Sequence, residues 1–112
     1  MDKITFKDFE RIMSIDLDTK GDPCIEIQFC LDNCTKYYSS WLGKMKDKDT
    51  KKTVYWFGLV EDGTEAYDYD SFEQFVNAKV IHGFSLKDIW NLITLLSIDA
   101  SDVRSVLPLY LE

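Results

Sequence analysis

Thr53-Val-Tyr-Trp-Phe-Gly-Leu-Val60, Glu61-Asp-Gly-Thr64 and Glu65-Ala-Tyr-Asp-Tyr69 follow one another directly and carry the clearest structural signals in the chain. The first segment is β-branched and aromatic and is apolar on both faces, which is typical of a strand at the centre of a sheet. The Asp-Gly pair in the second segment favours a tight hairpin turn. We therefore expect residues 65–69 to run back antiparallel beside residues 53–60.

Two more strands are expected upstream of this hairpin. Residues 24–31 alternate strictly, with one face formed by Ile25, Ile27, Phe29 and Leu31 and the other by Cys24, Glu26, Gln28 and Cys30. This alternation predicts a half-exposed strand. Asp32-Asn33 favours a turn, after which residues 35–42 return as the hairpin partner. The charged residues 43–52 lack an apolar period and are expected to form a solvated loop.

Helical spacing of apolar residues marks three further segments. Residues 5–13, 71–80 and 85–96 each begin with Ser or Thr, and a polar residue that completes a capping arrangement follows three positions later. The third segment has the broadest apolar stripe, formed by Leu86, Ile89, Trp90, Ile93 and Leu96. Residues 106–111 are apolar and are expected to dock on the core as an irregular or extended tail.

The predicted order is one helix, four strands and two helices (α-β-β-β-β-α-α). Grouped strands with helices at the ends indicate an α+β fold, in which helices pack on one face of an antiparallel sheet of about four strands. The length of 112 residues and the hydrophobic fraction of 46% fit one domain over residues 1–112 with a single core.

Composition also restricts the cellular context. The N-terminal residues 1–5 lack the apolar region of a secretory leader, and no stretch approaches the roughly 20 apolar residues of a membrane span. Three cysteines form an odd set in a chain without a secretory signal, which favours reduced thiols. We therefore expect a soluble, cytoplasmic protein.

The charge balance restricts the partners. The formal net charge is −7, from 20 acidic and 13 basic residues, so the chain repels nucleic acid and anionic membranes. Residues 72–96 have the outline of a helix-turn-helix, but the second helix would offer only Lys87 and Asn91 to phosphates and bases. We expect no nucleic-acid and no membrane partner, whereas a basic protein partner is permitted.

The sequence predicts no calcium site. Asp16 and Asp18 alternate as carboxylates do in a calcium loop. Lys20 stands at the fifth position and Ile27 at the twelfth, where oxygen ligands are required. An acidic turn between a helix and a strand explains the pattern better.

The cysteines and the single histidine predict neither a zinc site nor a catalytic site. Cys24 and Cys30 are six residues apart on one predicted strand, roughly 20 Å at about 3.3 Å per residue, too far to share an ion. His82 precedes Gly83 and is expected at a helix end. No orienting or oxyanion group is marked around a cysteine paired with His82. No cofactor and no catalytic residue is therefore assigned.

Two charged clusters have a structural and a functional interpretation. Carboxylates around the second hairpin suit acid–base or metal chemistry, but tyrosines that alternate with acids also describe a strand with one wet face. Lysines in the predicted loop lack a glycine-rich phosphate cradle, which favours a solvated loop that protects strand edges. The carboxylates are Glu61, Asp62, Glu65, Asp68 and Asp70, and the lysines are Lys44, Lys46, Lys48, Lys51 and Lys52.

Aromatic residues are concentrated on neighbouring predicted strands. A single sheet with helices on one face cannot cover both sides of all of them, so some are expected at the surface or at an interface. Tyr and Trp beside carboxylates form favourable protein-binding surfaces, particularly toward a basic partner. The alternative is an aromatic-rich core whose helices and tail cover both faces. The predicted protein-binding residues are Tyr37, Tyr38, Trp41, Tyr55, Phe57, Glu65, Tyr67, Asp68 and Tyr69.

The leading functional hypothesis is a non-enzymatic protein-binding module with an acidic, aromatic surface. In being small, acidic and single-domain, the chain resembles bacterial immunity and antitoxin proteins. That likeness implies an inhibitor of a basic partner and covers no particular residues. One alternative is a small enzyme or ligand-binding domain that uses the carboxylates of residues 61–70. Another is a homodimer whose aromatic sheet faces or helices pair.

Overall fold

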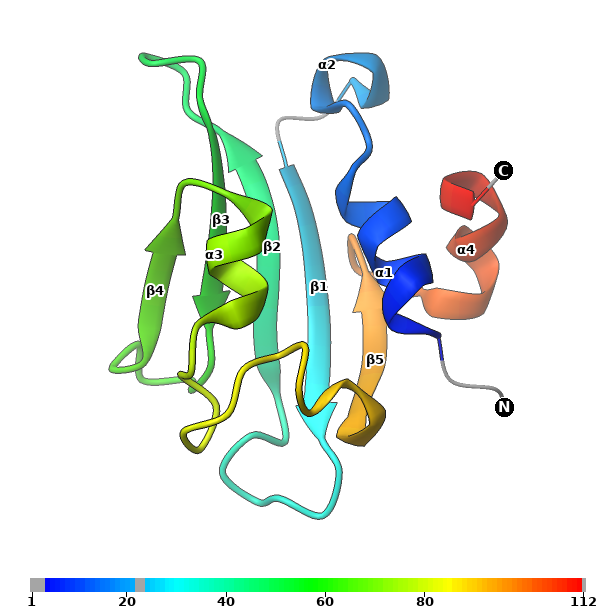
Figure 1. The fold of residues 1–112 in the computed structure, drawn as a ribbon. Coiled ribbons are helices and arrows are strands. Elements are labelled where there is room, and N and C mark those ends of the chain that lie inside the picture. The colour runs from blue at the N-terminus through cyan, green and yellow to red at the C-terminus, as the bar shows by residue number, and fades with distance from the viewer. Residues whose placement is uncertain (1–3, 22–23, 112) are drawn as a thin grey trace.

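The computed structural model describes residues 4–21 and 24–111 (Figure 1). Residues 1–3, which entered the leader prediction, lie outside the described residues, as do residues 22–23 and 112. All of the buried hydrophobic side chains belong to one cluster, which includes Phe9, Ile27 and Phe75. None of the helices in the described part of the chain is long and apolar enough to cross a membrane.

In the described part of the chain, six strands form one antiparallel sheet in the order β4-β3-β2-β1-β5-β6, which confirms the α+β class and adds two strands to the predicted four. The predicted strands at residues 24–31 and 65–69 are confirmed as β1 and β4, and β3 pairs antiparallel with β4 as expected. Strand β3 ends at Gly58, so the connection that contains Asp62-Gly63 is longer than a tight turn and spans residues 59–65. The strands are β1 (Cys24–Leu31), β2 (Ser40–Lys46), β3 (Thr53–Gly58), β4 (Ala66–Tyr69), β5 (Ile93–Ile98) and β6 (Ser101–Asp102).

Within residues 4–21 and 24–111, four α-helices accompany the sheet, together with one turn of 3₁₀-helix. They are α1 (Phe6–Met13), α2 (Leu17–Lys20), α3 (Phe72–Asn77), α4 (Val103–Leu111) and the 3₁₀ turn η1 (Trp90–Leu92). The predicted caps of the first two helices are confirmed, because Thr5 Oγ1 accepts a hydrogen bond from the Asp8 amide and Ser71 Oγ accepts one from the Gln74 amide. Helix α3 ends at Asn77, three residues before the predicted end.

The helix predicted over residues 85–96 is wrong. Ser85 Oγ does accept a hydrogen bond from the Asp88 amide, but the chain then turns through η1 and continues as β5. Strand β5 pairs antiparallel with β1. A bulge in β5 opposite Gln28 and Phe29 shifts the pairing register by one residue and so changes which β5 side chains point to the core. Pairing supplies backbone partners to an edge of β1 that would otherwise lack them, and this long-range gain outweighs the local helical period.

Three other features of the fold differ from the prediction. Strand β2 begins at Ser40 and continues to Lys46, so residues 43–46 are strand and only the remainder of the predicted loop is loop. Strand β3 lies second from one edge, and the centre of the sheet is formed by β2 and β1. Residues 106–111 belong to helix α4 rather than to an irregular tail.

The sheet has one covered face and one open face. Helices α1 and α3 lie on the same side of the sheet in Figure 1, with the segment between α3 and β5 crossing below them. Many side chains that point to this side are buried, among them Ile27, Leu42 and Phe57, which lie opposite one another on three neighbouring strands. On the opposite side, Glu26 and Asp68 are exposed and Trp56 is half-buried.

Candidate functional site

The predicted binding residues do not form one surface. Tyr55, Phe57, Tyr67 and Tyr69 point toward the helices, because they share the strand faces that pack on α3. The Phe57 ring stacks on Phe75 with centroids 4.4 Å apart, and the rings of Tyr55 and Tyr69 contact the same Phe75 at 5.7 and 6.3 Å. These four aromatic side chains belong to the hydrophobic core or pack against it.

Three other predicted residues lie at one end of the sheet, outside the strands. Tyr37 is buried, and its hydroxyl donates a 2.6 Å hydrogen bond to Glu65. Tyr38 is exposed and its hydroxyl donates to Glu61 at 3.0 Å. The carboxylate of Glu65 also forms a 2.7 Å ion pair with Lys36. Together with Tyr37, Lys36 lowers the pKa of Glu65, since both favour the ionised carboxylate.

Only Trp41 and Asp68 of the predicted set lie on the open face, where other residues join them. Alternation and register place the following side chains there: Cys24, Glu26, Gln28 and Cys30 from β1, Trp41, Gly43 and Met45 from β2, Val54, Trp56 and Gly58 from β3, and Ala66 and Asp68 from β4. We call this set the open face. Met45 is 44% exposed, and both tryptophans are half-buried.

Trp56 is the centre of the open face, and two glycines make room for it. In the antiparallel register Trp56 lies opposite Gly43 of β2. A Cβ atom on Gly43 would lie 2.9 Å from Cζ2 and 3.1 Å from Cε2 of the Trp56 indole, so the ring rests directly over the glycine. A Cβ atom on Gly58 would lie 4.0 Å from Trp41 Cβ and from Trp56 Cζ3. The backbone of β2 thus supports a large, half-exposed aromatic surface.

The open face is acidic. Glu26 and Asp68 are exposed on it, and none of the strand residues that form it is Lys or Arg. Asp99 is at the adjoining end of β5, where its carboxylate accepts a 2.9 Å hydrogen bond from the Glu26 amide. The face therefore presents two tryptophans in a field of negative charge.

The carboxylates of residues 61–70 do not converge on a common centre. Asp62 accepts hydrogen bonds from the side chain and amide of Thr64, and both lower its pKa. Glu65 is engaged by Lys36 and Tyr37, whereas Asp68 points to the open face. Among residues 4–21 and 24–111, no group of three His, Cys, Asp or Glu side chains is placed to hold a metal ion.

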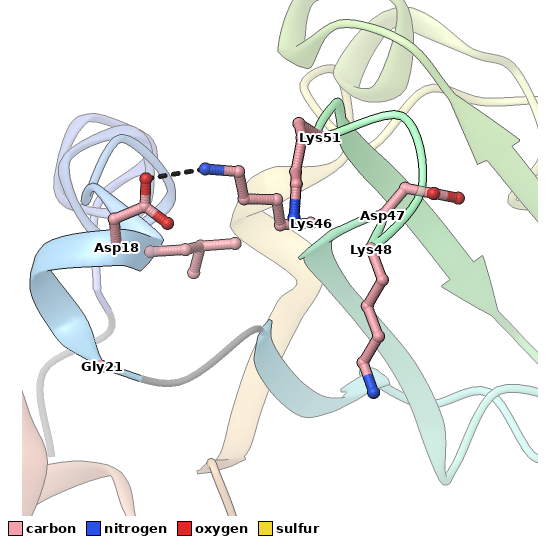
Figure 2. Close-up of a pocket in the computed structure, with 7 residues that line it drawn as sticks. Asp18, Gly21, Lys46, Asp47, Lys48 and Lys51 are labelled. Carbon is pink, nitrogen blue, oxygen red and sulfur yellow. Dashed lines mark hydrogen bonds and ion pairs between the residues drawn. The ribbon is translucent and has the colours of Figure 1, made fainter.

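The lysine-rich loop borders a pocket of about 450 Å³ beside α2 (Figure 2). Lys46 forms a 2.7 Å ion pair with Asp18, while Lys48 extends away from that pair in Figure 2. Asp47 stabilises the turn between β2 and β3, because its carboxylate accepts hydrogen bonds from the Thr50 and Asp49 amides. These hydrogen bonds lower the pKa of Asp47. The lysines do not converge, and Asp18, from the predicted acidic turn, neutralises one of them.

Lys44 is a buried cation that the sequence did not indicate. It was expected in a solvated loop, but it is only 5% exposed, in the row of the covered face between Ile25 and Tyr55. Its ammonium group donates to the carbonyl oxygen of Ile15. Burial lowers the pKa of Lys44, and the negative charge of Asp16 opposes that shift only in part.

The buried Lys44 predicts a pH dependence of stability. Its pKa is lower in the folded state than the ordinary value of 10.5, so between these two values the unfolded chain binds more protons. The free energy of unfolding of the wild type should therefore rise, relative to that of Lys44→Met, as the pH is increased from 7 toward 10. Urea denaturation of both proteins across this range measures the difference, in which the tyrosine contributions cancel. Parallel curves would contradict the assignment.

Sequence reasoning missed Trp56, Met45 and Glu26 as members of one surface. Because side chains alternate along residues 53–60, Trp56 lies on the other face of the strand from Tyr55 and Phe57. The sequence therefore indicates two faces. Which face the helices cover depends on the tertiary fold. No protein-family model, no curated protein and no solved structure matches this chain.

Proposed function

We propose that the chain is a non-enzymatic protein-binding module whose open face holds a basic segment of another protein. The observation that carries this proposal is the half-exposed Trp56 indole, supported by Gly43 and flanked by carboxylates on a face without Lys or Arg. A role as inhibitor of a basic effector is consistent with such a surface.

The register of the sheet places side chains that could recognise a basic segment next to one another. Asp68, Trp56, Gly43 and Glu26 lie in one row across four strands, at about 4.8 Å per strand. A guanidinium or ammonium group over the Trp56 ring would gain a cation–π interaction and would lie beside the Asp68 carboxylate. Aromatic anchors surrounded by complementary charge are typical of binding hot spots, and the charge also accelerates encounter with a basic partner.

The same features disfavour the two alternatives. Two copies that paired through the open face would bring Glu26 and Asp68 of each chain near like charges, which opposes association. Two carboxylates of the second hairpin, Asp62 and Glu65, are engaged by Thr64, Lys36 and Tyr37, and Asp68 points to the open face, so these groups do not form one acid–base centre.

The first experiment measures a defined ligand. Isothermal titration with tetra-arginine peptide should show saturable binding that weakens between 50 and 500 mM salt, since charge screening reduces the attraction. Trp56→Leu and Glu26→Gln/Asp68→Asn should each weaken binding by about tenfold or more, in line with roughly 1–2 kcal/mol for a desolvated cation–π or charge contact. Tetra-glutamate should not bind.

A matched control separates the open face from net charge alone. Glu10→Gln/Glu73→Gln removes two exposed carboxylates from α1 and α3, on the covered side. This variant should bind tetra-arginine within about twofold of wild type, as expected for screened, distant charges. Equal losses in both double variants, no binding at 50 mM salt, or a dimer abolished by Trp56→Leu in light scattering would each overturn the proposal. Partners captured from lysate and then purified should show the same ranking of variants.

A further inference from the structure

We propose that Cys34 is a reactive thiol, activated by His82, that undergoes exchange with small disulfides. The site lies outside the open face, at the end of β1 where the loop to β2 begins. Cys34 Sγ and His82 Nε2 are 3.3 Å apart, although the residues are 48 positions apart in the sequence. This is the separation of a thiol that donates its hydrogen bond to an imidazole nitrogen.

The backbone fixes the position of the imidazole. His82 and Gly83 form a two-residue turn with φ of 52° and 80°, both in the left-handed region. Ile81 and Phe84 close the turn with reciprocal amide–carbonyl hydrogen bonds of 3.1 and 2.9 Å. Ile81 is fully buried, so the turn is anchored in the core while His82 is exposed.

Packing fixes the orientation of the ring. The rings of Tyr37 and His82 meet edge to face, with centroids 4.8 Å apart. Tyr37 is itself held by its hydrogen bond to Glu65, which Lys36 fixes in turn. The predicted binding residues Tyr37 and Glu65 therefore act here as positioning residues. On the other side, the Cys34 amide donates to the Leu31 carbonyl, which holds the thiol at the end of β1.

The chemistry requires a base, access and a co-reactant. His82 Nε2 accepts the proton of the Cys34 thiol, and the thiolate attacks one sulfur of a small disulfide such as oxidised glutathione. A bond forms between Cys34 and that sulfur, the original S–S bond breaks, and the departing thiolate takes the proton from His82. Cys34 is oxidised and the departing sulfur is reduced. Access is available because Cys34 is half-buried and His82 is exposed.

The test isolates Cys34 in a Cys24→Ser/Cys30→Ser background, the other cysteines being Cys24 and Cys30. Mass spectrometry follows formation of the mixed disulfide with oxidised glutathione at pH 7. His82→Asn is the matched variant, because Asn accepts the left-handed backbone of the turn but cannot take up the proton. We expect about a tenfold slower reaction in His82→Asn, because an unassisted thiol is already ionised to a few per cent at pH 7.

A second comparison does not depend on the variant. The same background protein unfolded in 8 M urea places Cys34 far from His82, so the native protein should react about tenfold faster than the unfolded chain at pH 7. Equal rates in the native and unfolded states, or equal rates with and without His82 at pH 7, would overturn the proposal. Binding of tetra-arginine by the open face is unaffected by either result.

Discussion

Replacing Gly43 with alanine is expected to lower the free energy of unfolding by about 3 kcal/mol or more, a large part of the roughly 5–15 kcal/mol of a small domain. The added Cβ would overlap the carbonyl oxygen of Ile25 and lie 2.9 Å from Trp56 Cζ2. The tryptophan can rotate away, but the carbonyl belongs to the central strand β1, so relief requires β1 and β2 to separate. Urea denaturation followed by far-UV circular dichroism measures the loss.

Gly58→Ala is the matched control for this prediction. Gly58 is also a strand glycine on the open face, but a Cβ atom there would meet its nearest neighbours at 4.0 Å, an ordinary contact distance. We expect the free energy of unfolding to change by no more than about 1 kcal/mol, because alanine loses less backbone entropy on folding than glycine and meets no steric clash here. Equal destabilisation by both substitutions would show that loss of glycine flexibility, rather than the close approach of β1 and β2, determines the effect.

Phe75→Ala is expected to cost about 3–5 kcal/mol, the range for truncation of a fully buried aromatic side chain. Phe75 has no exposed surface, and its ring is the common neighbour of Phe57, Tyr55 and Tyr69 on the covered face. Together with Phe72, which contacts Tyr55, it attaches α3 to the sheet, so the cavity would lie between the helix and the sheet. Calorimetry should show a lower melting temperature, and urea denaturation should show the loss of free energy.

Phe84→Ala provides the comparison for an exposed aromatic residue. Phe84 is 55% exposed, and the hydrogen bonds that close its turn come from the backbone. We expect the free energy of unfolding to fall by less than about 1 kcal/mol, because folding removes little apolar area of this side chain from water. A loss at Phe75 as small as that at Phe84 would mean that α3 is not packed on the sheet as described.

The candidate site could be predicted only in part. The sequence shows an excess of aromatic side chains and acidic charge, and the alternation in residues 53–60 divides them between two faces. It does not show which face the helices cover, so the sequence alone does not separate Trp41 from Tyr55, Phe57, Tyr67 and Tyr69. The pairing of Cys34 with His82 and the burial of Lys44 depend on segments that meet only after folding.

The sequence by itself determined the elements whose stabilising contacts lie within a few residues. The Thr5 and Ser71 caps, the alternation of β1 and the antiparallel return of β4 after Asp62-Gly63 depend on neighbouring residues, and the sequence predicts each of them. The tertiary structure decided the rest. Residues 93–98 have a helical period but pair with β1, because backbone hydrogen bonds along an otherwise unpaired edge outweigh a weak local preference. The same packing, by placing α1 and α3 on one side, left Trp56 on the open face.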